Sequence, residues 1–429
     1  MTRLLRAGRM RGVSLIELLI ALAIGSLLVL GLVDVFAASR TAYQLSEGLA
    51  RVQENGRFAV DYLQRDLRMV GHAGCVNDQS RFLPENDSGT RSALASTFLK
   101  SPDLIANNYG AAYVKDYLRF DQGIVGYEAD GTSDGDTFTS VPDPVEAGDP
   151  AAWTPTIPAA LWSELRKAAG TVGNIVENTD VVVLHYFAPN GAQMTAFAPG
   201  DPTATITVDP SKWSRMVAGV PTAGLFGIGD CMNAAVFHAS AVDSAAGTLT
   251  VTRDDTINLG AMAGYESFIP AQAMVFRAET VVYYVGRNAD GNPALYRMRY
   301  EIPPGATAFP ANPATREELV EGIETLQLRY GQDSRTAASQ RPTGNIGSSG
   351  TADELTPAGD PATAWRRVGL VQVGLVARSD NPSAATDRNT TAVPLSLHGL
   401  TILPPATNDT RFRAVYEESV AVRNRLFGQ

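Results

Sequence analysis

The feature that most constrains the fold is an apolar run from Leu18 to Ala38, broken only by small residues, Ser26 and Asp34. A helix needs about 20 apolar residues to cross a bilayer. Four arginines precede this run, and the first twelve residues contain no acid. Basic residues on one flank are expected to hold that flank in the cytoplasm, so the rest of the chain should lie across the membrane.

One residue, Glu17, does not suit an ordinary membrane anchor. It stands at the head of the apolar run with no cation beside it in the sequence. A carboxylate at membrane depth costs roughly 2.5–3.5 kcal/mol on insertion scales and usually marks function. If the chain were cut after Gly12, the ammonium of Val13 would lie four residues before Glu17. That amine could pair with Glu17 of the same chain or of a neighbouring one.

The segment Gly12-Val13-Ser14-Leu15-Ile16-Glu17 resembles the class III signal of type IV pilins and type II secretion pseudopilins. The resemblance implies a leader of residues 1–12, removed by a prepilin peptidase after Gly12. It also implies methylation of the new N-terminus at Val13, where the family usually has Phe, and a role for Glu17 in assembly. The alternative is an uncleaved signal anchor.

The helix should continue beyond the membrane, because apolar residues recur at spacings of three and four while the other face is charged. No proline occurs between Val13 and Gly71. We predict a helix over 13–72 with 13–38 in the membrane, roughly 85 Å long at 1.5 Å per residue. Its second half should pack on a soluble head through Leu49, Val52, Gly56, Ala59, Leu63, Leu67 and Val70.

Several later segments narrow the resemblance to the PilW group of minor pilins. A helix end runs into a Gly-Cys turn at Cys75, a Gly-Asp-Cys turn ends at Cys231, and a Tyr-Tyr-Val-Gly hairpin begins at Tyr283. The segments 319–324 and 422–425 also resemble the PilW group. Each segment is short, and their order along the chain carries the resemblance.

The remainder, 73–429, reads as a β-rich head. Strand patterns occur at 180–187, 225–239, 247–252, 279–285, 294–300, 326–330, 367–378 and 412–426. Short helices are predicted over 317–325 and around 159–167. A variable region covers 76–178, and 331–361 is predicted to be a long loop. A long helix followed by antiparallel strands, without βαβ alternation, gives an α+β class.

The only two cysteines in the sequence are Cys75 and Cys231. In an exported chain we predict that they form a disulfide, with two buried free thiols as the alternative. The bridge would tie the end of the long helix to the middle of the head. By loop entropy, so long a loop could contribute on the order of 5 kcal/mol.

No catalytic constellation appears in the sequence, and we predict neither an enzyme nor a cofactor. The four histidines are scattered, and there is no CxxC, HExxH, GxSxG or P-loop pattern. The cluster Asp130, Asp134 and Asp136 is the minor alternative of a calcium loop, but Asp-Gly clusters are typical of plain turns. Removing the leader would take the net charge from -10 to -10 - 4 = -14, which argues against nucleic acid as a partner.

The resemblance implies a minor pilin that starts pilus assembly and sits in the tip complex, hence a role in motility and adhesion. Its partners would be other minor pilins, the major pilin, a tip adhesin, the prepilin peptidase and the inner membrane. The head would lie in the periplasm before assembly and outside the cell afterwards. The alternatives are a minor pseudopilin of type II secretion and a membrane-anchored periplasmic binding protein that does not polymerise.

Overall fold

The structure is a computed structural model of the chain. Of the predicted leader it describes only Gly12, and much of the predicted variable region also lies outside the described residues. The described residues are 12–75, 83–85, 89–91, 118–120, 122–141, 143–220, 222–231, 234–253, 258, 268–306, 315–335, 342–355, 361–379, 393–403, 405, 409 and 411–426.

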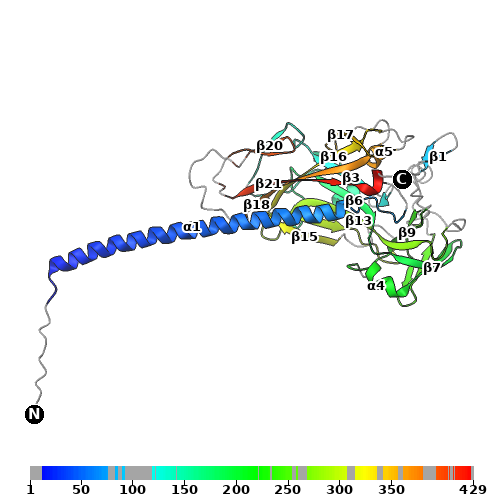
Figure 1. The fold of residues 1–429 in the computed structure, drawn as a ribbon, viewed down its shortest axis with the longest axis horizontal. Coiled ribbons are helices and arrows are strands. Elements are labelled where there is room, and N and C mark those ends of the chain that lie inside the picture. Colours follow the sequence, from blue (N-terminus) through cyan, green and yellow to red (C-terminus); the bar gives the residue numbers. More distant parts are fainter. Residues whose placement is uncertain are drawn as a thin grey trace, which may run out of the picture.

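A single helix, α1 (Leu15–Leu67), reaches from the N-terminus into the head. Its 53 residues correspond to about 80 Å. Its first half projects away from the rest of the protein and its second half lies along the head (Figure 1). The helix ends in a turn that leads to Gly71, whose φ of 70° favours glycine. The N–H of Gly71 then donates to the carbonyl of His185, 3.1 Å away.

The centre of the head is a 12-stranded sheet, and its longest strand, β13 (Met274–Arg287), links two regions. The second half of β13 pairs with β6 and β14. All seven residues of β6 are buried, as a continuous apolar run predicts for a strand covered on both faces. The other strands here are β3 (Ile124–Ala129), β5 (Trp153–Thr154), β6 (Val181–Phe187), β14 (Pro293–Arg299) and β15 (Thr315–Glu321).

The first half of β13 belongs to a distal module, which we define as residues 188–273 together with this half-strand. The module has its own hydrophobic core, which includes Ile206, Phe226 and Phe237. Figure 1 places β7, β9 and α4 at the end of the head away from the free end of α1. Its elements are β7 (Ala192–Ala198), β8 (Thr203–Val208), η5 (Pro210–Lys212), α4 (Trp213–Met216), β9 (Leu225–Gly229), β10 (Ala234–His238), β11 (Ala241–Asp243) and β12 (Thr248–Thr252).

A separate four-stranded sheet, here the C-terminal sheet, has the order β17-β16-β18-β21. Its strands are β16 (Ile323–Asp333), β17 (Ile346–Gly350), β18 (Val368–Arg378) and β21 (Arg413–Ala421). The second half of α1 contacts β18 and β21. The main core lies between α1, the central sheet and this sheet, so the helix is held by both.

The remaining elements are short. Strands β4 and β20 pair in parallel, the one parallel pair among the described strands. These elements are β1 (Leu83–Glu85), β2 (Gly89–Arg91), β4 (Thr137–Thr139), η4 (Pro150–Ala152), α3 (Ala159–Leu165), α5 (Pro361–Arg366), β19 (Leu395–Leu397), β20 (Leu400–Leu403) and α6 (Arg423–Leu426). The predicted α+β class, with a long N-terminal helix on a large antiparallel sheet, is confirmed.

The predicted helix over 317–325 is wrong. The segment forms the end of β15, a turn at Gly322 with a φ of 76°, and the start of β16. Pairing of β15 with β14 overrides helix propensity, and the Glu317 carboxylate accepts a hydrogen bond from Arg297 on the neighbouring strand at 2.7 Å.

The predicted loop over 331–361 is partly wrong as well, because β17 lies within it and pairs with β16. The carboxylate of Asp333 organises the described part of the connection. It accepts hydrogen bonds from the backbone N–H groups of Thr343 at 2.8 Å and Gly344 at 2.6 Å. Similarly, the described part of the predicted variable region contributes β3 and β5 to the central sheet.

Candidate assembly interface along the N-terminal helix

The N-terminus of α1 is closed by a capping box. The side-chain oxygen of Ser14 accepts a hydrogen bond from the N–H of Glu17 at 3.2 Å, and a Glu17 carboxylate oxygen accepts one from the N–H of Ser14 at 3.3 Å. Glu17 therefore has a local role in starting the helix, besides the charge pairing predicted for it. The Ser-x-x-Glu spacing of residues 14–17 is the local sequence signal that predicts such a capping box.

The first half of α1 is an uncovered apolar rod. Every large apolar side chain from Val13 to Phe36 is more than half exposed. The helix is long and apolar enough to cross a membrane, and its most apolar stretch is not buried in the head. An uncovered apolar surface of this length requires a bilayer or the apolar helices of other subunits.

The second half of α1 docks on the head as the periodicity predicts. Val52, Ala59 and Leu63 are fully buried, whereas Leu49 lies near the edge of the contact and is exposed. A Cβ at Gly56 would collide with the ring of Tyr416 on β21, so this position requires glycine for close approach. The remaining buried members of the stripe are Leu67 and Val70.

A buried polar cluster fixes the helix on the central sheet. The hydroxyl of Tyr283 on β13 donates to Asp66 of α1 at 2.6 Å, and Arg297 on β14 pairs with the same carboxylate at 3.5 Å. Burial raises the pKa of Tyr283 well above its ordinary value, and the negative charge of Asp66 raises it further. Tyr283 therefore remains a neutral hydrogen-bond donor across physiological pH. No local sequence signal identifies Asp66 as a buried partner, because its contacts come from strands more than 200 residues away in the sequence.

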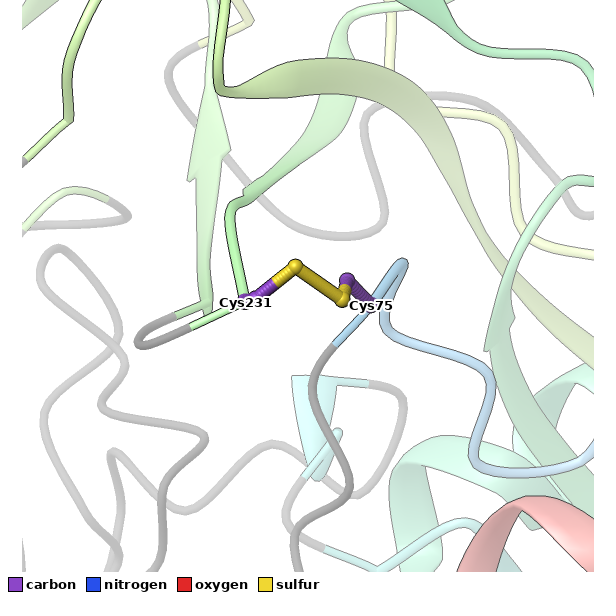
Figure 2. The surroundings of a disulfide bond; sticks show 2 residues. All are labelled: Cys75 and Cys231. Carbon is purple, nitrogen blue, oxygen red and sulfur yellow. A yellow bond between two sulfur atoms is a disulfide. The ribbon is translucent and has the colours of Figure 1, made fainter.

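The predicted pairing of Cys75 with Cys231 is present as a disulfide, shown in Figure 2. The Cα atoms are 4.7 Å apart, within the usual range, and the two cysteines are 156 residues apart in sequence. Cys75 follows the turn after α1, and Cys231 follows β9 in the distal module. The bond therefore ties the end of the long helix directly to the distal module.

The aspartates of the alternative calcium loop serve turns and contacts. Asp134 forms an ion pair with Arg329 at 3.1 Å, and Asp136 accepts a hydrogen bond from the N–H of Ser133 at 3.1 Å. Asp130 accepts one from Thr154 at 3.4 Å. Within the described part of the chain, no group of three or more His, Cys, Asp or Glu side chains is arranged to hold a metal ion.

The described histidines also have separate structural partners. His72 contacts the carbonyl of Phe187 at 2.9 Å, and His238 contacts that of Pro303 at 2.8 Å.

The architecture is that of a type IV pilin-like protein. It has a long helix with a free apolar half, a capping box at the start of this helix, and a large sheet-rich head on its second half.

Comparison with known families agrees with this class. Residues 8–33 match the family model described as the prokaryotic N-terminal methylation motif. Residues 282–424, about a third of the chain, match the model described as Type IV Pilus-assembly protein W. This match spans the hairpin of β13 and β14 and the C-terminal sheet. The resemblance to the PilW group that was inferred from the sequence is therefore supported over these residues.

Among solved structures, this chain is similar to a type IV-like pilin from Thermus thermophilus. The match covers 35% of this chain and 70% of the Thermus chain, with 18% sequence identity. The TM-score is 0.18, which is too low to add to the assignment. No curated protein matches the chain in sequence. The family matches point to a structural, non-enzymatic type IV pilin. The distal module lies outside both matched residue ranges.

Proposed function

We propose that this protein is a minor pilin that takes part in starting type IV pilus assembly and in forming the tip complex, and through these in motility and adhesion. The observation that carries the proposal is the continuous α1, whose first half is free and apolar and whose second half is buried in the head. Such a helix can leave a bilayer and enter a bundle of similar helices, because both environments cover its apolar surface.

The maturation we propose has two steps. Prepilin peptidase cleaves the inner-membrane precursor after Gly12, and the new N-terminus at Val13 is methylated. Glu17 then compensates the N-terminal charge of the neighbouring subunit. Support comes from the methylation-motif match and from the position of Glu17 at the start of α1.

A tip position is proposed from the size and direction of the head. The helix enters the head at one end, and the distal module forms the other end (Figure 1). If the N-terminus of α1 is on the cytoplasmic side, the distal module faces away from the cell. Such a bulky subunit is hard to repeat along a shaft, so we propose other minor pilins, the major pilin and a tip adhesin as its partners.

Deletion of the gene is expected to reduce surface pili and twitching motility without affecting type II secretion. Sheared pili and secreted proteins would be quantified from the same cultures, with the wild-type gene restored as the control. Loss of secretion with normal pili would instead identify a pseudopilin. Full function of a head carried on an ordinary lipid anchor would contradict any role in a filament and favour a periplasmic binding protein.

A further inference from the structure

A second acidic side chain, Asp34, lies in the apolar half of α1 that the head leaves uncovered. It is exposed, and its neighbours Val33 and Val35 are 56% and 68% exposed. A carboxylate within a membrane segment carries a cost and usually marks a functional position. Asp34 is 17 residues beyond Glu17. These residues span about 25 Å of helix, so the N-terminal charge that Glu17 compensates does not reach Asp34.

The apolar half of the helix supplies no cation for Asp34. The sequence has no lysine, arginine or histidine from Val13 to Ser39, and the first cation beyond the apolar run is Arg40. Arg40 lies six residues on, which at about 100° per residue places it about 120° away around the helix. The positions that lie next to Asp34 on the helix surface, three or four residues away, are Leu30, Gly31, Ala37 and Ala38.

Asp34 continues the stripe through which α1 docks on the head. Residues 34, 38, 41, 45, 48 and 52 recur at spacings of four and three, so they share one face of the helix. Val52 is fully buried, and a Cβ at Gly48 would lie 3.6 Å from Ser379 of the head. Asp34 lies 18 residues before Val52, about 27 Å along the helix. It is therefore on the side of α1 that carries the head, on the part that projects beyond the head (Figure 1).

A membrane and a filament make different demands on this carboxylate. Asp34 lies 21 residues after Val13, about 32 Å along the helix, and the hydrocarbon core of a bilayer is about 30 Å thick. In the precursor the carboxylate therefore reaches the headgroups and water at the outer face of the membrane. In a bundle of apolar helices, neighbouring subunits replace this water. The carboxylate then needs a positive charge to offset the cost of its desolvation.

We propose that Asp34 binds a lysine or arginine of the pilin-type subunit that packs beneath the head, as a second assembly contact besides Glu17. This inference rests on the proposed function. Charge complementarity selects a cationic side chain, and the position of Asp34 on the head side of the helix selects a subunit that enters below the head.

This chain itself has the pattern that such a partner needs, because Arg40 follows shortly after an apolar helix. Arg40 is six residues beyond Asp34, which corresponds to about 9 Å along the helix. A parallel neighbour with the same pattern, displaced by this distance toward the cell, brings its own first cation level with Asp34.

The test is the incorporation of Asp34→Ala, measured as the amount of this subunit in sheared pili relative to the amount in membranes. We expect this ratio to fall by at least about fivefold, because the cation of the partner would enter the bundle unpaired. Poor membrane insertion does not explain such a loss, since removing a charge from a membrane helix eases insertion. Asp34→Glu keeps the charge and should retain most of the wild-type ratio.

Ser26→Ala is the matched control, because it also removes a polar group from the apolar half of α1. The hydroxyl of Ser26 donates to the carbonyl of Ala23 in the same helix at 2.9 Å, so it needs no partner from another subunit. We expect the wild-type ratio for this variant. Normal incorporation of Asp34→Ala, or an equal loss in both variants, would overturn the Asp34 contact and leave the proposed function intact. Absence of the wild type from pili would contradict both.

Cross-linking within assembled pili identifies the partner. A photoreactive amino acid in place of Ala38 lies one turn from Asp34 on the same face and leaves the carboxylate in place. We expect an adduct with a pilin-type subunit, at a site within one helical turn of a lysine or arginine. An adduct with a segment that contains neither residue would overturn the proposed ion pair.

Discussion

Glu17→Ala is expected to leave the head folded but to lower the amount of this subunit in sheared pili by at least about tenfold, the change produced by roughly 1.4 kcal/mol. The head does not contact this end of α1, whose side chains are exposed. Inside a filament, however, the loss would leave a neighbouring N-terminal charge without its partner in an apolar environment. Immunoblots of membranes and of sheared pili measure the two quantities separately.

Glu17→Gln separates the two roles of this residue. Gln also closes a capping box, so it should preserve the helix start while removing the charge. Ser14→Ala is the matched control, because it removes the hydrogen bond accepted by Ser14 but leaves the carboxylate of Glu17. We expect Gln to fail in assembly and Ser14→Ala to succeed. Normal incorporation of Glu17→Gln would show that capping, not charge, is what assembly needs.

Replacing both cysteines by serine is expected to lower the free energy of unfolding by about 5 kcal/mol, with 2–5 kcal/mol as the usual range for native disulfides. The magnitude reflects the sequence separation of 156 residues, because closing so long a loop removes much conformational entropy from the unfolded chain. Cys75 and Cys231 are both exposed, so the substitutions themselves should disturb little packing. Urea unfolding of both full-length proteins in detergent would measure the difference in the free energy of unfolding between the double serine variant and the wild type.

The control for the disulfide is chemical. Wild-type protein unfolded in the presence of a reductant should show the same midpoint as the double serine variant, because both lack the same covalent link. A wild type that unfolds at the same urea concentration with and without reductant would contradict the predicted contribution. In that case the buried contacts of Leu63 and Asp66 would suffice to hold the helix.

The parts of the fold that were predictable are those with long, strong periodicity. The stripe from Val52 to Val70 identified the docked face of α1, and the apolar run at 181–187 identified β6. The helix was predicted to reach residue 72, whereas α1 ends at Leu67 and a turn with a positive φ at Gly71 follows it. The disulfide was predicted because the sequence has only two cysteines and the chain is expected to be exported.

Other features depend on contacts between distant segments. The charged segment 317–325 has a helical composition, but pairing with β14 makes it part of two strands. Nothing local marks Asp180 as a partner of β3, because the pairing of β3 with β6 brings its carboxylate to the N–H of Ala129, 3.0 Å away. The capping box at Ser14 and Glu17, by contrast, has a local signal in the sequence, the Ser-x-x-Glu spacing, which was not among the predicted features.

The central claim is that this chain is a processed pilin subunit. The most direct test is the mass of its N-terminal peptide, from cells with and without prepilin peptidase. We predict cleavage after Gly12 with a methylated Val13, and an intact leader when the peptidase is missing. An intact leader in both strains would contradict the claim and leave an anchored periplasmic protein in its place.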